Sequence, residues 1–135
     1  MDWEAWARGA EAALDVAGRG DWGGLFAPGA TFADPATTEP TTDLRLISRD
    51  TKKVFPDWRQ EITSIRGGDD WAVFEWTGFA TYSPGEGLPG HGAAIEMHGA
   101  TIIEVDGDGL VTSWRDYLDR KEPESQIRRA AGAAR

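Results

Sequence analysis

The second half of the chain contains four long segments whose composition is typical of β-strands. They are rich in aromatic and β-branched residues, and they cover positions 58–65, 71–82, 93–105 and 110–118. Gly67-Gly68-Asp69-Asp70 separates the first two segments, and Asp106-Gly107-Asp108-Gly109 separates the last two. Such short turns join antiparallel neighbours. This half therefore predicts a meander of antiparallel strands, one face of which another layer must cover.

Helices for that layer are expected in the first half of the chain. Apolar side chains recur at helical spacing over residues 3–18, with Asp2 as a suitable N-cap and Gly18 and Gly20 as the stop. Helices followed by a run of strands predict an α+β fold, in which the N-terminal helices pack on a curved, mainly antiparallel sheet. With no repeat or linker, we expect one domain over residues 1–135.

Shorter elements connect these parts. The expected order is a helical turn around Trp22, Leu25 and Phe26, a turn at Pro28-Gly29, a short strand over 30–34 that ends at Pro35, a loop over 36–42, and a helix over 43–54 that ends before Pro56. A Gly/Pro-rich loop over 83–92 joins two of the long strands. A last helix is expected to begin at Glu122, with a frayed end over 130–135.

Composition excludes several classes of function. The chain has no cysteine, so it can form neither a disulfide nor a thiolate metal site. Its net charge is −9, which should repel nucleic acid and anionic membranes. We see neither a secretory signal nor an apolar run long enough to span a bilayer, and therefore expect a soluble cytoplasmic protein. Seven tryptophans suit either an ordinary core or the aromatic walls of a small-molecule pocket.

The final strand carries a carboxylate where an apolar residue is expected. Strand residues alternate between faces, so Trp114, Asp116 and Leu118 share one face and Arg115, Tyr117 and Asp119 share the other. Asp116 thus lies between two large apolar neighbours. A carboxylate in such a place is costly unless it is hydrogen-bonded or kept for chemistry. Arg115 and Asp119 are expected to be a solvated pair of surface charges.

Several motifs resemble the nuclear-transport-factor-2-like superfamily, which has a conical α+β fold that encloses a pocket. Gly20-Asp21-Trp22, Leu25-Phe26-Ala27 and Ala30-Thr31-Phe32-Ala33-Asp34-Pro35 resemble the opening of ketosteroid-isomerase-like members. Other motifs resemble the SnoaL-like polyketide-cyclase branch, namely Phe55-Pro56-Asp57-Trp58-Arg59, Gly87-Leu88-Pro89-Gly90 and Trp114-Arg115-Asp116-Tyr117. The resemblance implies the fold, whereas the reaction varies widely among such proteins.

The resemblance also implies site residues. Asp34 matches the general base of ketosteroid isomerase, but the two oxyanion donors of that enzyme fall near Ala13 and Thr101. Asp116 matches the final-strand aspartate of limonene epoxide hydrolase and the late acid/base of SnoaL-type cyclases. The arginine and aspartate that the hydrolase needs on its middle strand are replaced by Trp76 and Gly78.

Polyether-type epoxide hydrolases pair an Asp-Pro aspartate with an acid 27 residues later, a spacing that Asp34 and Glu61 share. Glu61 is a possible catalytic residue for this reason, although alternation along its strand favours a solvent-facing position. Glu75, between Phe74 and Trp76, is in a similar position.

Each catalytic candidate has an alternative structural role. Asp34 could accept a proton at the pocket, or form an Asx-turn that caps the following loop. Asp116 could act as general acid or base with a raised pKa, or pair with an arginine such as Arg59, which would lower its pKa. His98, expected on the outer face, and His91, in the loop 83–92, are further possible catalytic residues.

These residues suggest a cofactor-free acid–base enzyme that isomerises or cyclises a hydrophobic polyketide-, terpene- or steroid-like molecule. Asp34 and Asp116 would carry the chemistry, and the substrate-binding residues would be Trp58, Trp76, Trp114 and Tyr82. Two isolated histidines do not indicate a metal site. The alternatives are an epoxide hydrolase of the limonene or polyether type, and a non-catalytic module for ligand binding or dimerisation. The resemblance also implies a homodimer.

Overall fold

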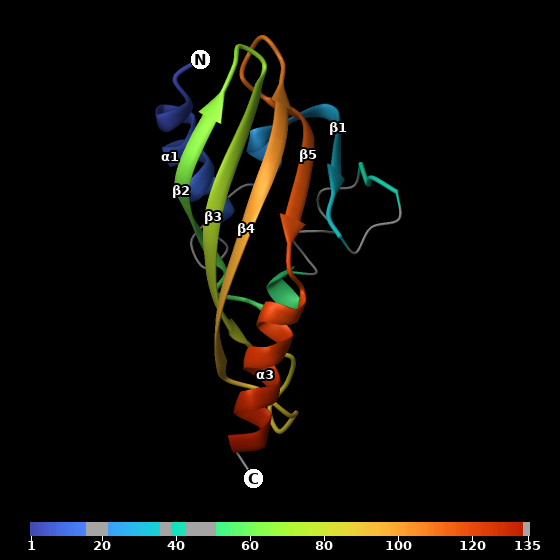
Figure 1. Cartoon of the computed structure of the whole chain (residues 1–135). Coiled ribbons are helices and arrows are strands. Elements are labelled where there is room, and N and C mark those ends of the chain that lie inside the picture. Colours follow the sequence, from blue (N-terminus) through green and yellow to red (C-terminus); the bar gives the residue numbers. More distant parts are fainter. Residues whose placement is uncertain (16–21, 36–38, 43–50, 134–135) are drawn as a thin grey trace.

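The computed structural model describes residues 1–15, 22–35, 39–42 and 51–133. Within these ranges the elements follow each other in the order α1 (Trp3–Leu14), the 3-10 helix η1 (Trp22–Leu25), β1 (Phe26–Ala33), β2 (Arg59–Gly67), β3 (Trp71–Tyr82), β4 (Ala93–Val105), β5 (Val111–Leu118) and α3 (Lys121–Ala133) (Figure 1). Residues 51–54 are also helical and end before Pro56, as predicted. The rest of the helix expected over 43–54 lies outside the described residues.

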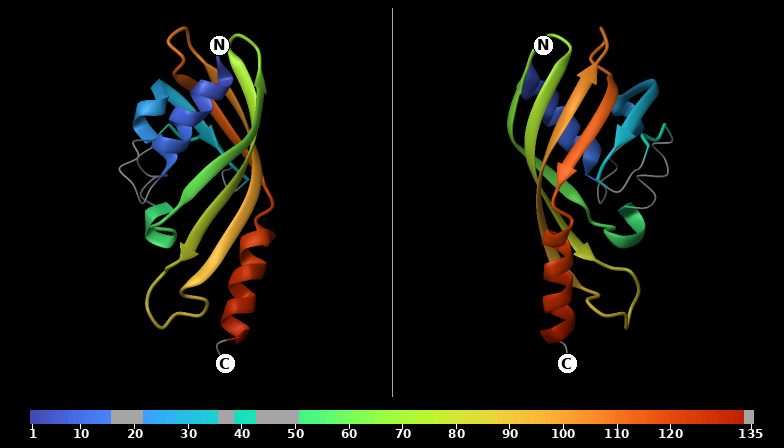
Figure 2. Two further views of the ribbon diagram at one scale, coloured as in Figure 1. Left: turned by 90° about the vertical axis from the view of Figure 1, so that its left-hand side faces the viewer. Right: turned by 45° about the vertical axis from the view of Figure 1, so that its right-hand side comes forward.

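A single five-stranded sheet with the order β1-β5-β4-β3-β2 organises the structure. Strands β2 to β5 form the predicted antiparallel meander, and β1 joins its edge parallel to β5. The sheet is strongly twisted, and α1 and the helical turn at 51–54 lie on the same side of it (Figure 2). The predicted α+β class and conical type of fold are confirmed.

Helix α1 covers the β2 side of the sheet. Its cap is the predicted one, because the Asp2 carboxylate accepts a hydrogen bond from the backbone of Ala5 at 3.0 Å. Its buried face contains Trp3, Ala7, Ala10 and Leu14. The Trp3 indole donates to the Gly68 carbonyl at 2.9 Å. The prediction of a helix to residue 18 was wrong, since Asp15 already has extended backbone angles. Gly18 and Gly20 lie outside the described residues.

The predicted turn at Pro28-Gly29 lies inside β1, which begins at Phe26 and not at residue 30. Pairing with β5 is irregular between Phe26 and Thr31, and Gly29 has a φ of 76°. Glycine adopts this angle at little cost. The strand therefore passes through the irregularity and continues to Ala33, which places Asp34 at the end of the strand.

Helix α3 continues the line of β5 beside β4 (Figure 1). Strand β5 ends at Leu118, opposite Gly99, so the edge of β4 before Gly99 has no strand partner there. Side chains of α3 take that place. Glu122 accepts from the His98 backbone N–H at 2.6 Å, and Gln126 bonds both backbone groups of Glu96 at 2.7–2.8 Å.

The described part of α3 reaches Ala133. Ile127 and Ala130 pack against the core, which stabilises this segment. None of the described helices is long and apolar enough to cross a membrane.

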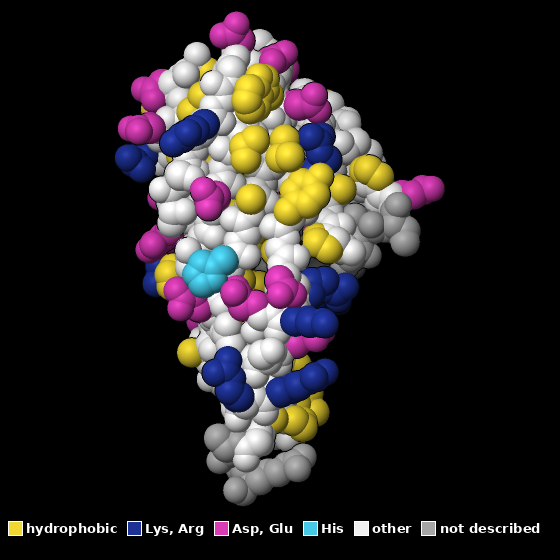
Figure 3. Space-filling view, in the orientation of Figure 1, with side chains coloured by type: hydrophobic (Ala, Val, Ile, Leu, Met, Phe, Trp, Pro, Cys, Tyr) yellow, Lys and Arg dark blue, Asp and Glu magenta, His cyan; other side chains and the backbone are white. Residues whose placement is uncertain are grey.

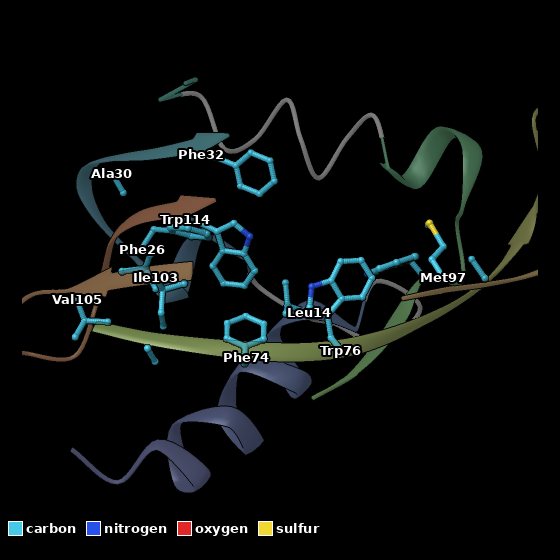
Figure 4. Packing of buried hydrophobic residues seen from close by; sticks show 14 of the residues in the cluster. Leu14, Phe26, Ala30, Phe32, Phe74, Trp76, Met97, Ile103, Val105 and Trp114 are labelled. Carbon is cyan, nitrogen blue, oxygen red and sulfur yellow. The ribbon is translucent and has the colours of Figure 1, made fainter. Parts of the chain in front are cut away.

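The core is aromatic and lies on the concave side of the sheet. Phe32 stacks on Trp114 with ring centroids 6.4 Å apart, and Phe74 meets Trp114 edge-on at 5.4 Å (Figure 4). Trp58 meets Trp76 edge-on at 6.0 Å. Rings in these arrangements attract each other beyond the effect of burial alone. The sheet makes room for them with glycines, since a Cβ at Gly78 would collide with the six-membered ring of Trp58.

Two glycine-to-alanine substitutions should therefore have opposite effects. Gly78→Ala should destabilise the fold by about 1–3 kcal/mol because of overpacking against Trp58. Gly9→Ala, in α1, meets nothing within 4 Å and should stabilise the fold by up to ~1 kcal/mol through helix propensity. Urea unfolding of the two variants and the parent protein measures both. Equal stability of the two variants would contradict the packing described for Trp58.

Candidate active site

A cavity of about 190 Å³ opens on the concave side of the sheet. Its walls are mostly aromatic or aliphatic, and its polar side chains among the described residues are two carboxylates, one threonine and one carboxamide. The lining residues are Leu14, Phe26, Phe32, Asp34, Thr51, Phe55, Trp58, Gln60, Trp76, Met97, Trp114, Asp116 and Leu118. A mainly apolar cavity with a few converging polar groups is the usual form of a small-molecule site.

Asp116 is held at one end of this cavity by a chain of hydrogen bonds. Its Oδ1 accepts from the Thr101 hydroxyl at 2.6 Å and from the Trp114 indole at 2.7 Å. The Thr101 oxygen in turn accepts from the Trp76 indole at 2.9 Å. Within the described part of the chain, no residue donates to Oδ2. One oxygen is therefore fixed by the fold, and the other is left for a ligand in the cavity.

Burial changes the acidity of this group. Asp116 is half-buried, and it lines a cavity whose walls are mainly apolar. Desolvation raises its pKa to about 6, from an ordinary value of 3.8. The hydrogen bonds from Thr101 and Trp114 act in the opposite direction, and the negative charge of Asp34 adds to the increase. A carboxyl with such a pKa can exchange a proton near neutral pH.

The register of two strands brings Asp34 to this carboxylate. In the parallel pair of β1 and β5, Phe32 lies opposite Trp114 and Ala33 lies opposite Arg115. Asp34 is the next residue and so comes level with Asp116. It is half-buried and lines the same cavity. The two predicted catalytic residues are thus neighbours, although 82 positions separate them in the sequence.

Three of the four predicted substrate-binding residues, Trp58, Trp76 and Trp114, line the cavity. Tyr82 does not, because it packs against Phe55 with ring centroids 6.1 Å apart. It is half-buried in this contact, at a position beyond the described lining of the cavity.

The possible catalytic residues Glu61, His98 and His91 lie elsewhere. Glu61 is on the outer face and pairs with Arg59 at 3.2 Å, so its spacing from Asp34 does not bring the two acids together. His98 is exposed and contacts Glu122 at 3.1 Å, on the outer face as predicted. His91 accepts a hydrogen bond from the backbone of Gly85 at 3.3 Å, within its own loop.

The remaining charged residues of the sheet also lie away from the cavity. Arg59 lies on the outer face over the Phe79 ring, and so it does not pair with Asp116. Arg115 pairs with Glu104 at 3.6 Å, and Asp119 accepts from the backbone of Lys121 at the start of α3. The prediction that Arg115 and Asp119 form a pair was therefore wrong. Glu75 bonds Ser64 at 3.0 Å in an exposed position.

Sequence reasoning missed two residues of the site. Gln60 is 8% exposed and lines the cavity, and Thr101 is fully buried. The available signal for Gln60 was a carboxamide between Trp58 and Ile62 on the inward face of a strand. Thr101 gave a weaker signal, because threonine is common in strands.

Among the described residues, no group of three or more acidic or histidine side chains is arranged to hold a metal ion.

The sequence profile of the SnoaL-like domain matches residues 3–114. The chain belongs to the SnoaL-like family. A search of curated protein sequences found no match. Among solved structures, IdmH from Streptomyces antibioticus, a candidate polyketide cyclase, is similar with a TM-score of 0.77 at 20% identity, over 94% of this chain and 99% of that one.

Two further structures are similar to this SnoaL-like protein. AclR from Streptomyces galilaeus, a candidate hydroxylase, has a TM-score of 0.75 at 18% identity, over 92% of this chain and 83% of its own. An LEH-like epoxide hydrolase from M. tuberculosis has a TM-score of 0.67 at 18% identity, over 95% and 92% of the two chains. At these identities the similarity shows a shared fold.

The raised pKa of Asp116 predicts a pH-dependent effect of Asp116→Asn on stability. The folded protein binds the proton of the Asp116 carboxyl more tightly than the unfolded chain does. This preference adds fully to the free energy of unfolding below pH 4 and is lost as pH rises through about 6. Relative to Asp116→Asn, the wild-type protein should lose up to about 3 kcal/mol of unfolding free energy between pH 4 and 7.

Denaturant unfolding at several pH values measures this difference. Asp108→Asn, in an exposed turn, is the matched control and should follow the wild type at every pH. A constant difference between wild type and Asp116→Asn over this range would contradict the raised pKa.

Proposed function

We propose that this SnoaL-like protein is an acid–base enzyme that moves a proton on a small hydrophobic molecule, in an isomerisation or a ring closure. The observation that carries the proposal is the Asp116 carboxyl, fixed through Oδ1 and facing an aromatic cavity with a pKa of about 6. Cyclase-like and isomerase-like members of the same fold support this kind of reaction.

In the proposed reaction Asp116 is the general base at neutral pH. Ionised above pH 6, it accepts a proton from the substrate through Oδ2 and returns it as the conjugate acid at a second position. Asp34 makes Asp116 more basic through its negative charge, and it is close enough to the same end of the cavity to take part in the second transfer. The aromatic walls exclude water while the proton is held.

The size of the cavity limits the substrate. Its volume of about 190 Å³ is below the 300–1,000 Å³ that is usual for drug-sized ligands. We therefore propose a substrate with one or two rings, of polyketide or terpene type, and regard a steroid as too large.

The geometry gives less support to epoxide hydrolysis. That reaction needs an acid donor that faces Asp116. Position 76, where the resemblance places an arginine, holds a tryptophan whose N–H is already bonded to Thr101. The similar fold of an LEH-like epoxide hydrolase is the reason to include epoxides in the assay.

Turnover tests the proposal. On any substrate found in a panel of cyclic ketones, polyketide-type aromatic esters, limonene oxide and styrene oxide, Asp116→Asn should lower kcat/KM by about 10²–10⁴. The asparagine can still accept from Thr101 and Trp114, so the fold should be preserved. In the wild type, kcat/KM should rise with pH, with a midpoint at about pH 6. In Asp34→Asn the midpoint of this rise should move to lower pH, because the charge that raises the pKa of Asp116 is removed.

Thr101→Val provides the opposite shift. It removes a hydrogen bond that lowers the pKa of Asp116, so the midpoint of the rise in kcat/KM should move to higher pH. Thr101→Ser keeps the hydroxyl group and should behave as wild type. Full turnover by both Asp116→Asn and Asp34→Asn would refute the proposal.

We also propose that two copies of the chain pair through the outer face of the sheet. Hydrophobic side chains gather on this face over the central strands (Figure 3). Trp71, Val73 and Tyr117 are 47%, 37% and 53% exposed there. Large exposed apolar side chains on one face favour association.

Light scattering at micromolar concentration should therefore show a dimer, and Tyr117→Asp should convert it to a monomer. Leu88→Asp, which changes an exposed apolar residue of the loop 83–92, is the control and should remain dimeric. A monomeric wild type would refute the pairing.

A further inference from the structure

The wall of the cavity formed by β2 contains two polar groups that the fold does not use. The Gln60 side chain is more than nine-tenths buried and lines the cavity, yet its carboxamide makes no hydrogen bond to any described residue. Trp58, two residues earlier on the same face, is 6% exposed, and its indole N–H has no hydrogen-bond partner in the described structure. Buried polar groups almost always have partners, so two such groups in one wall require an explanation.

The other buried indoles show how unusual this wall is. Trp3 donates to Gly68, Trp76 donates to Thr101 and Trp114 donates to Asp116, at 2.7–2.9 Å. The fold therefore satisfies its buried indole donors everywhere in the described structure except beside Gln60. A partner supplied from outside the chain would complete the pattern.

The two polar ends of the cavity are well separated. Gln60 on β2 lies opposite Gly78 on β3, which in turn lies opposite Met97 on β4. Asp116 on β5 lies opposite Thr101, which is also on β4. Met97 and Thr101 are four residues apart, which is about 13 Å along a strand. Trp76 pairs with Gly99, which lies midway between Met97 and Thr101 on β4, so its ring comes between the two polar ends. The cavity thus has a carboxylate end and a neutral end, with an aromatic wall between them.

We propose that Gln60 binds a neutral oxygen of the substrate, a carbonyl or a hydroxyl group, at the end of the cavity remote from Asp116. The substrate is then a flat molecule with one or two rings, with an oxygen at one end and the carbon or oxygen that loses a proton at the other. Gln60 is a positioning and specificity-determining residue, which fixes the atom that meets Asp116. This inference rests on the proposed function only for the identity of the reacting end.

The composition of the chain makes a direct test possible. Gln60 and Gln126 are its only glutamines, and it contains no asparagine, so an amide NMR spectrum should hold two side-chain NH₂ pairs. Gln126 is bonded to the backbone of Glu96, outside the cavity, and serves as an internal control. The probes are 1-indanone and indane, which have the same two-ring skeleton with and without a carbonyl. At pH 8 the Asp116 carboxyl is ionised and cannot donate to the carbonyl.

With 1-indanone, the NH₂ protons of Gln60 should move downfield while those of Gln126 stay in place, and indane should not produce the downfield shift. Gln60→Leu should weaken binding of 1-indanone by roughly 3- to 10-fold, the effect of one hydrogen bond, and leave binding of indane unchanged. The infrared carbonyl stretch of bound 1-indanone should rise in this variant. Gln126→Leu, the matched substitution outside the cavity, should change neither quantity.

The proposal fails if 1-indanone binds without moving the Gln60 signals, if it does not bind, or if Gln60→Leu weakens both probes equally. The NMR measurement uses the wild-type protein, so it gives an answer even if a variant does not fold. It also requires no turnover. If the Gln60 signals respond but Asp116→Asn and Asp34→Asn are fully active, the proposed reaction is refuted and the binding role of Gln60 stands. If the Gln60 signals do not respond but both variants lose activity, the binding role is refuted and the proposed reaction stands.

Discussion

The hydrogen-bond chain from Trp76 through Thr101 to Asp116, closed by Trp114, is the interaction on which the rest of the site depends. It joins β3, β4 and β5 inside an aromatic core. A carboxylate in that place would be prohibitively costly without donors, and these donors engage only one of its oxygens. The same chain therefore makes burial tolerable and leaves an oxygen for chemistry. The raised pKa follows because desolvation outweighs the two hydrogen bonds.

The parallel attachment of β1 adds the second acid. Without that edge strand the sheet would be a plain antiparallel meander, and Asp34 would have no fixed position relative to Asp116. Because β1 passes through an irregularity at Gly29 and then pairs in register with β5, Asp34 arrives level with Asp116. The negative charge of Asp34 adds to the desolvation that raises the pKa of Asp116.

Much of the fold could be predicted from local patterns. Segments 71–82 and 93–105 coincide with β3 and β4, since alternation and flanking turns are local signals. The position of Asp116 on the inward face followed from the same alternation. The spacing between Asp34 and Glu61 was misleading, because spacing does not say which face of a strand a residue occupies. Tyr82 was predicted to bind substrate, whereas in the structure it packs against Phe55. Gln60 was overlooked because a polar residue at an inward position gains meaning only when the cavity beside it is known.

The sequence by itself determined the strands, the capped first helix, the class of fold and the face on which Asp116 lies, because each depends on residues close together in the chain. Only the tertiary structure decided that Asp34 comes level with Asp116 and that Thr101 and Trp114 hold one oxygen of the Asp116 carboxylate. It also decided that Gln60 lines the cavity and that the buried Trp58 indole N–H has no hydrogen-bond partner in the described structure. These properties depend on strand register and on the burial of groups far apart in sequence. Both arise only when the strands pair and the chain folds around its aromatic core.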